Sequence, residues 1–143
     1  MNDTNYHNVI REMIKEETSI VNNRMNWLIL LEGLLFAGYS SLSTRGFSLY
    51  IIGILGFVVS LCMRYSILSS EKAIAFIMDN WNRYLKKNNM KYMDFPPVWA
   101  GANLQTNRLQ AIMTAHRFIP FVFMLAWVGL IINTLLLNLG IFK

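Results

Sequence analysis

The 143-residue sequence has very little of the chemistry that disulfide-bonded, metal-binding and catalytic proteins need. Cys62 is its one cysteine, so a disulfide framework and a cysteine-based metal site are excluded within the chain. His7 and His116 are its two histidines, and neither belongs to a pattern with serine, cysteine or carboxylate that is typical of catalysis. No glycine-rich phosphate loop and no metal-ligand spacing occurs. We therefore expect no enzyme activity, no cofactor and no bound metal.

One catalytic alternative rests on Arg108 and His116, which lie on a single predicted helix. The pair faintly resembles the Arg-and-His signature of HEPN ribonucleases. It is separated by eight positions, which exceeds the usual spacing, and Leu109 stands where that family has an acidic or polar residue. The basic residues of the chain are also spread over several segments rather than forming one arm or stripe. We therefore expect neither nuclease activity nor a nucleic-acid partner.

The composition is rich in apolar residues, being 55% hydrophobic with a mean hydropathy of +0.37. The apolar residues form three blocks, Trp27–Leu42, Phe47–Met63 and Phe118–Phe142. A membrane-spanning helix needs roughly 17–25 residues, so the first two blocks are near the minimum length and the third is ample. The alternative is a soluble helical protein, which would have to hide three such helices in one small core. We expect three membrane spans.

Acidic residues are few, with 8 aspartates and glutamates against 13 lysines and arginines, a net charge of +5. If the segments between the apolar blocks alternate sides, one side receives the N-terminus and residues 64–117, with eleven of the 13 basic residues. The other side receives only Arg45 and Lys143. By the positive-inside rule the basic side is cytoplasmic, and the C-terminus lies outside. These features predict a multi-pass protein of the bacterial cytoplasmic (inner) membrane.

Helix-breaking residues are rare, and their rarity predicts long helices. Apolar residues recur at helical spacing over residues 5–25, and no proline or glycine separates this stretch from the first apolar block. We expect the first helix to run unbroken into the membrane, the alternative being a separate helix in the interface. The second helix is expected to run from Leu49 to Leu85. The third is expected from Asn103 to Ile141, with Pro120 just inside the membrane boundary.

The predicted fold class is an all-α membrane protein of three long helices, each part transmembrane and part cytoplasmic stalk. Residues 1–143 are expected to form a single helical membrane domain. The predicted stalk segments are residues 4–25, 64–87 and 103–117, and the predicted spans are about residues 27–43, 47–64 and 118–141.

Two connections join the predicted helices. Ser43–Gly46 is a short turn, so the first two spans are expected to form an antiparallel hairpin. Residues 88–102 form the one long loop, in which two consecutive prolines forbid helix. Phe95 and Trp99 indicate that this loop packs on another surface. With Trp81 of the second helix, they are the candidate residues for docking a cytoplasmic partner protein.

Small residues recur every three or four positions in each span. Such rows allow helices to approach closely in lipid and to associate. Packing within one protomer and packing between subunits remain equally open alternatives at this point. The rows are Gly33, Ala37 and Ser41 in the first span, Gly53, Gly56 and Ser60 in the second, and Ala126, Gly129 and Asn133 in the third.

Glu32 lies within the first apolar block, about 12 Å beyond Arg24 at 1.5 Å per residue. An ionisable side chain in a span is by default a candidate functional site. The Trp127 indole and the Ser60 hydroxyl are the nearest polar candidates at its depth, and neither carries a charge. Glu32 is therefore expected to be a protonated structural group, a hydrogen-bonding group between subunits, or a group that faces water in a pore, where a ring of acids would favour cations.

Further polar groups lie at the two ends of the spans. Arg24 and Asn26 belong to a dense polar set at the inner boundary. Arg24 is expected either to extend toward lipid headgroups or to form part of a polar collar, paired with Glu17 or with a neighbouring subunit. Asn133 lies about 24 Å from the inner boundary and is expected in an outer polar cluster. Together with Glu32 these residues are the pore or intersubunit candidates.

The first span carries a recognisable pattern. Asn22, Arg24, Trp27 and Leu28 match Asn-x-Arg-x-x-Trp-Leu, and residues 33–39 match Gly-x-Leu-Phe-Ala-x-Tyr. The pattern resembles a signature of small bacterial inner-membrane proteins, in which a glutamine commonly stands at the position of Glu32. The resemblance therefore implies that a polar group suffices at this position.

The layout of about the first 70 residues also resembles RipA-type octameric membrane proteins and the accessory membrane pore protein of one type VI CRISPR branch. The resemblance implies a homo-oligomer in the lipid bilayer, with the chain itself as its main partner. It also implies a channel or envelope-perturbing effector in antiviral (phage) defence, with Glu32 and the Arg24 region along or beside the pathway. The alternative function is a membrane anchor or scaffold whose stalk docks a cytoplasmic protein without conduction.

Overall fold

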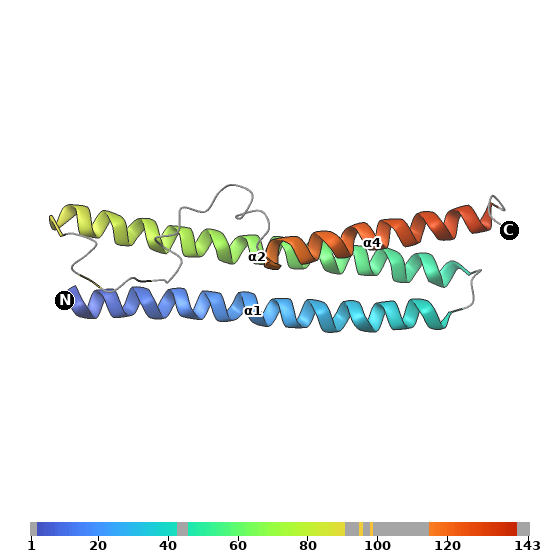
Figure 1. Cartoon of the computed structure of the whole chain (residues 1–143), viewed down its shortest axis with the longest axis horizontal. Helices are drawn as coiled ribbons and strands as arrows, with labels where there is room; N and C mark the ends of the chain where they lie inside the picture. Colours follow the sequence, from blue (N-terminus) through green and yellow to red (C-terminus); the bar gives the residue numbers. More distant parts are fainter. Residues whose placement is uncertain (1–2, 43–45, 91–94, 96–97, 99–114, 140–143) are drawn as a thin grey trace.

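The structure is a computed structural model that describes residues 3–42, 46–90, 95, 98 and 115–139. Three helices account for nearly all of these residues, and no strand occurs among them. Helix α1 comprises Asp3–Ser41, α2 comprises Phe47–Lys87 and α4 comprises Ala115–Asn138. Helices α1 and α2 run antiparallel along the length of the molecule, and α4 lies along the N-terminal half of α2, at the end of the molecule where the C-terminus is marked (Figure 1).

The first two helices are continuous, as the sequence predicts. Helix α1 has 39 residues and α2 has 41, so they are about 58 and 62 Å long at 1.5 Å per residue. The stretch 5–25 is therefore part of the same helix as the first apolar block, and the alternative of a separate N-terminal helix is wrong. The predicted start of the third helix at residue 103 lies outside the described residues. So do Trp99, Arg108, residues 43–45 of the predicted turn and most of the predicted loop.

Within the described part of the chain, two helices, α2 and α4, are long and apolar enough to cross a membrane. Only 22% and 17% of their most apolar windows are buried, whereas the core helix of a soluble protein is mostly buried. Helix α1 is not among the helices that meet this test, and its apolar block contains Glu32. The first of the three expected spans therefore stays a prediction.

Two halves of the molecule can be distinguished by composition. We call residues 27–42, 46–64 and 115–139 the apolar half, and residues 3–26, 65–90, 95 and 98 the polar half. The expected three-helix stalk corresponds to the polar half, of which the structure describes the two helices α1 and α2.

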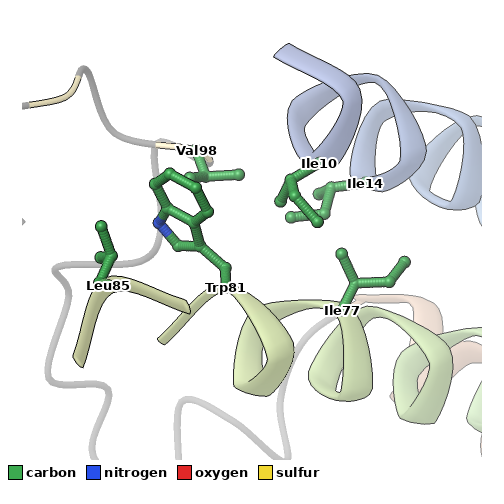
Figure 2. Packing of buried hydrophobic residues seen from close by; sticks show 6 residues of the cluster. All are labelled: Ile10, Ile14, Ile77, Trp81, Leu85 and Val98. Atoms are coloured by element: carbon green, nitrogen blue, oxygen red, sulfur yellow. The ribbon is translucent and has the colours of Figure 1, made fainter. Parts of the chain in front are cut away.

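The polar half has a hydrophobic core of its own between α1 and α2. Figure 2 shows the Trp81 indole directed away from α2 with Val98 beside it, while Ile10 and Ile14 of α1 lie across from Ile77. Isoleucines and large aromatic groups at helical spacing bury a continuous stripe on each helix, which is what holds two helices together in water. The buried members are Ile10, Ile14, Ile77, Trp81, Leu85 and Val98.

A second cluster joins all three helices where the two halves meet. Met25 and Leu28 of α1 and Ile67 of α2 are buried there, and Ile119 and Phe123 of α4 pack against them. Helix α4 thus enters the bundle at the level where the apolar half begins. This cluster sets the register in which the polar groups of α1, α2 and α4 can meet.

Candidate functional site

Glu32 lies at the meeting point of the three helices in the apolar half, and its side chain is completely buried. The Ser60 hydroxyl of α2 donates a hydrogen bond to Glu32 Oε1 at 2.5 Å. The Trp127 indole N–H of α4 donates to Glu32 Oε2, also at 2.5 Å. One carboxyl group on α1 therefore connects α2 and α4, and both donors are the ones that the sequence nominates.

Glycine at position 56 is what lets the indole reach the carboxylate. A Cβ atom built on Gly56 would overlap the Trp127 ring, so the α2 backbone itself forms one wall of the indole site. One turn away, a Cβ on Gly53 would lie 2.8 Å from Cγ1 of Ile131. The small-residue row of α2 is therefore a close-packing surface within the protomer, which is one of the two alternatives left open by the sequence.

Aromatic rings of α1 complete the surroundings of the indole. The Phe36 ring stacks on Trp127 with its centroid 4.4 Å away and an interplanar angle of 5°. Tyr39 meets the indole edge-on at 6.0 Å. The Tyr39 hydroxyl hydrogen-bonds with the Thr134 hydroxyl at 2.7 Å and donates to the Leu130 carbonyl at 3.3 Å. These contacts extend the link between α1 and α4 by about two helical turns beyond Glu32.

The site is polar but closed. Each carboxylate oxygen accepts a hydrogen bond, and among the described residues no buried side-chain nitrogen or oxygen lacks a partner. A polar group in an apolar interior is costly unless such partners satisfy it. The geometry therefore favours a structural role for Glu32 inside one protomer over a position facing a neighbour or a pore.

The other two small-residue rows face outward. Gly33, Ala37 and Ser41 of α1 are exposed, and a Cβ on Gly33 would have no neighbour within 4 Å. On α4, Gly129 is equally open and the Asn133 side chain is exposed, with Ala126 half-buried. These rows are free to meet other chains.

Arg24 turns toward α2 rather than toward lipid headgroups or Glu17. Its Nη1 donates to the Ser66 carbonyl at 2.8 Å and to the Ser70 hydroxyl at 2.6 Å. Ser70 itself is buried. Asn26, two residues further along α1, is exposed. The structure thus separates the inner-boundary candidates: Arg24 joins two helices of the protomer, and Asn26 remains on the surface.

The Glu71 carboxylate of α2 contacts His116 and Arg117 at the start of α4. The Arg117 Nε donates to both carboxylate oxygens, at 2.7 and 2.9 Å. The Nε2 of His116 lies 2.9 Å from Glu71 Oε1. The hydrogen bond to Glu71 raises the pKa of the Arg117 guanidinium above its ordinary value. Sequence reasoning missed Glu71, although it lies two helical turns after Arg64 on the same face of α2.

Among the described residues, the protomer satisfies its buried polar groups internally and leaves small residues on its outer faces. The model of the octameric membrane protein family matches residues 6–136. The chain belongs to this family. Comparisons with curated proteins and with solved structures find no match. Family membership implies a membrane setting and self-association, in line with the resemblance to RipA-type proteins, while the first-span pattern stays a prediction.

In this octameric-family chain two of the three candidate docking residues, Trp81 and Phe95, lie inside the polar half. Trp81 is 1% exposed and Phe95 packs against it edge-on, with ring centroids 5.5 Å apart. The Phe95 ring also stacks on the buried His7 ring at 5.6 Å. The two aromatic residues that the structure describes therefore hold the stalk together, and Trp99 lies outside the described residues.

Proposed function

We propose that this octameric-family protein is a channel or envelope-perturbing effector of the bacterial inner membrane, without enzyme activity. In this proposal three spans cross the bilayer, with the N-terminus inside and the C-terminus outside. Several protomers associate side by side and enclose an aqueous pore. The proposal takes its oligomeric and membrane character from the family and its pore from the distribution of polar groups.

The observation that carries the proposal is the position of Asn133. Its side chain is exposed on α4, a mostly apolar helix, and makes no hydrogen bond to another described residue. A primary amide is expensive in hydrocarbon unless a protein group or water satisfies it. In an assembly, Asn133 is therefore expected to face a water-filled lumen or an adjacent subunit.

The outer faces of the protomer provide for assembly. A protomer of three helices has too few helices to surround a pathway, so conduction requires several copies. The exposed rows at Gly33 of α1 and Gly129 of α4 offer close approach for neighbouring helices on two helices of the protomer. Glu32, closed off by Ser60 and Trp127, holds each protomer together beside the pathway rather than lining it.

The alternative is a membrane anchor or scaffold whose stalk docks a cytoplasmic protein. The residues nominated for docking count against it, because Trp81 is buried and Phe95 packs against Trp81 and His7. A scaffold would need a different surface. The pore is therefore the better-supported function.

The test is ion conduction by the purified full-length protein in liposomes, with Asn133→Asp as the informative variant. A lumen-facing position predicts that this change shifts the reversal potential in a KCl gradient toward the K⁺ equilibrium value, because it adds one carboxylate per subunit to the lumen. Asn82→Asp, at an exposed asparagine of the polar half, is the matched control and should leave the reversal potential unchanged. Absence of wild-type conductance in an intact assembly would overturn the pore and favour the scaffold.

The mass of the detergent-extracted particle tests assembly separately. We expect a large homo-oligomer for the wild type and smaller particles for Gly33→Leu and Gly129→Leu, since each adds a side chain to an outer row. A wild-type monomer or dimer would leave no room for a central pore.

We further propose that the channel acts in phage defence, as the resemblance of the first span implies. Cells that express the wild-type chain should show fewer plaques than cells that express an assembly-deficient Gly129→Leu variant. Equal plaque numbers across a panel of phages would remove this part of the proposal and leave conduction unaffected.

A further inference from the structure

Three arginines mark the inner end of the apolar half, one on each helix, and one of them is differently placed. Arg24 donates to α2 and Arg117 is held by Glu71. Arg64 of α2 instead lies over the Phe121 ring of α4, with the guanidinium carbon 5.5 Å from the ring centroid. It makes no hydrogen bond or ion pair with another described residue. Its planar guanidinium therefore keeps its N–H donors available.

Arg64 borders a cavity of about 330 Å³ between α2 and α4. His116 and Arg117 also line it, as do the apolar side chains of Leu68, Phe118 and Phe121. The two phenylalanines remain 48% and 42% exposed, so the apolar wall continues onto the outer face of α4. The cavity thus combines a basic end with an apolar side that opens outward.

The charges around the cavity suit one negative charge. Two arginines line it, and the Glu71 carboxylate that binds Arg117 neutralises one of them, so the positive charge of Arg64 remains. The fork of N–H groups on a guanidinium matches the oxygens of a phosphate. Basic pockets between membrane helices on the cytoplasmic side are the places where anionic headgroups bind.

We propose that this cavity binds the phosphodiester headgroup of an anionic phospholipid from the inner leaflet. Arg64 is the phosphate ligand, and the start of an acyl chain lies along Phe118 and Phe121. A soluble phosphate would use the basic end but leave the apolar side uncovered, which is why the lipid is the better occupant. The proposal rests on the membrane setting of the family and on the inward orientation of this end, and it does not require conduction.

Lipid retention by the intact detergent-purified assembly tests the proposal, measured by native mass spectrometry after addition of phosphatidylglycerol or phosphatidylcholine. We expect the wild type to retain phosphatidylglycerol about tenfold better, since charge-assisted hydrogen bonds to Arg64 favour the anionic headgroup. Arg64→Gln should abolish this preference. Arg83→Gln is the matched control, because Arg83 lies on the same helix, is highly exposed and pairs only with Asp79 among the described residues.

Equal retention of the two lipids by the wild type would overturn the proposal, and so would an unchanged preference in Arg64→Gln. Displacement of the bound lipid by millimolar inorganic phosphate would show that the site serves a soluble anion instead. If Arg64→Gln fails to assemble, Arg64→Lys supplies the second test. This variant keeps the charge but loses the planar fork of N–H donors. Its retention of phosphatidylglycerol should lie between the wild type's retention of phosphatidylglycerol and the wild type's retention of phosphatidylcholine.

Discussion

Trp81 in the polar half and Trp127 in the apolar half are 1% and 0% exposed, yet their surroundings differ in kind. Trp81 lies among Tyr6, His7, Tyr84 and Phe95, with ring centroids 5.4 to 5.8 Å away. Trp127 donates a hydrogen bond to a buried carboxylate and fits against a glycine. The centre of the polar half is aromatic and aliphatic, whereas the centre of the apolar half contains a hydrogen-bonded acid.

In the proposed topology, with the apolar half in the bilayer and the polar half in water, the difference follows from the solvent that each half displaces. In water, burial of apolar surface between α1 and α2 is itself the driving force, so isoleucines and rings suffice. In lipid that force vanishes, and helices associate through close van der Waals contact and hydrogen bonds. The glycine row of α2 and the Glu32 contacts are therefore what a bilayer requires, and the Trp81 cluster is what water requires.

Truncation of the Trp81 side chain should have the largest effect on stability. Trp81→Ala removes the largest side chain of the polar core and is expected to lower the free energy of unfolding by about 3–5 kcal/mol. Phe76→Ala, on the same helix but 66% exposed, is the matched control and should change it by less than about 0.5 kcal/mol. Denaturant titration followed by circular dichroism measures both. Similar values for the two variants would mean that the polar half has no hydrophobic core.

A single added methyl group tests the apolar half. Gly56→Ala places a Cβ in the Trp127 ring and should cost about 3 kcal/mol, because the indole and its hydrogen bond must move. Gly38→Ala is the control, since its Cβ would meet only Cδ1 of Ile52 at 3.8 Å, an ordinary contact. Thermal unfolding in detergent compares them, and equal melting temperatures would contradict the close approach of α2 and α4.

Substitutions at Glu32 distinguish a need for polarity from a need for charge. Glu32→Leu leaves the Ser60 and Trp127 donors without an acceptor and should lower the free energy of unfolding by about 2 kcal/mol. Glu32→Gln keeps an oxygen for the indole and offers an N–H to the Ser60 hydroxyl, so it should cost less than about 1 kcal/mol. Ser60→Ala should cost less in the Glu32→Leu background than in the wild type. If the glutamine variant is as damaged as the leucine variant, the charge itself is required.

The smallest effect is expected at the outer edge of the polar core. The Tyr84 hydroxyl donates to Asp3 Oδ1 at 2.5 Å, and this hydrogen bond raises the pKa of Tyr84 above its ordinary value of 10.0. A raised folded-state pKa means that the contribution is complete below pH 10 and is lost as the pH rises through the folded-state value.

The wild type should therefore melt slightly above Tyr84→Phe at pH 7, and the difference should shrink above pH 10. Tyr65→Phe, at a tyrosine that is 68% exposed, controls for loss of a hydroxyl. A difference between wild type and Tyr84→Phe that stays constant up to pH 11 would disprove the link to Asp3.

Much of this architecture could be predicted from the sequence, because it depends on features that are local along the chain. The continuity of α1 follows from the absence of a breaker between the stretch 5–25 and the first apolar block. The partners of Glu32 could be named because depth along a helix is a simple count of residues, and few polar groups lie at that depth.

The contacts between helices depend on the rotation of each helix and on the register between helices. The spacing of residues along one helix determines neither. The rows at Gly33 and Gly56 have similar compositions, yet one faces outward and the other faces Trp127. The sequence predicts that Arg24 lies at headgroups, beside Glu17 or against a neighbouring subunit, whereas its partners are Ser66 and Ser70 of α2. The contacts of Glu71 could not be predicted from the sequence, because its partners lie on a helix that begins more than 40 residues later.

Helix α2 passes through both halves without a proline or an interruption. Trp81 and Gly56 are 25 residues apart on it, about 37 Å at 1.5 Å per residue. A straight helix of this length behaves as a rod, and sharp bends need a proline, a bulge or an inserted group. A push or a twist applied to the stalk therefore reaches the contact between Gly56 and Trp127 as a rigid displacement. In the proposed topology, α2 is in mechanical terms a lever that passes through the bilayer surface.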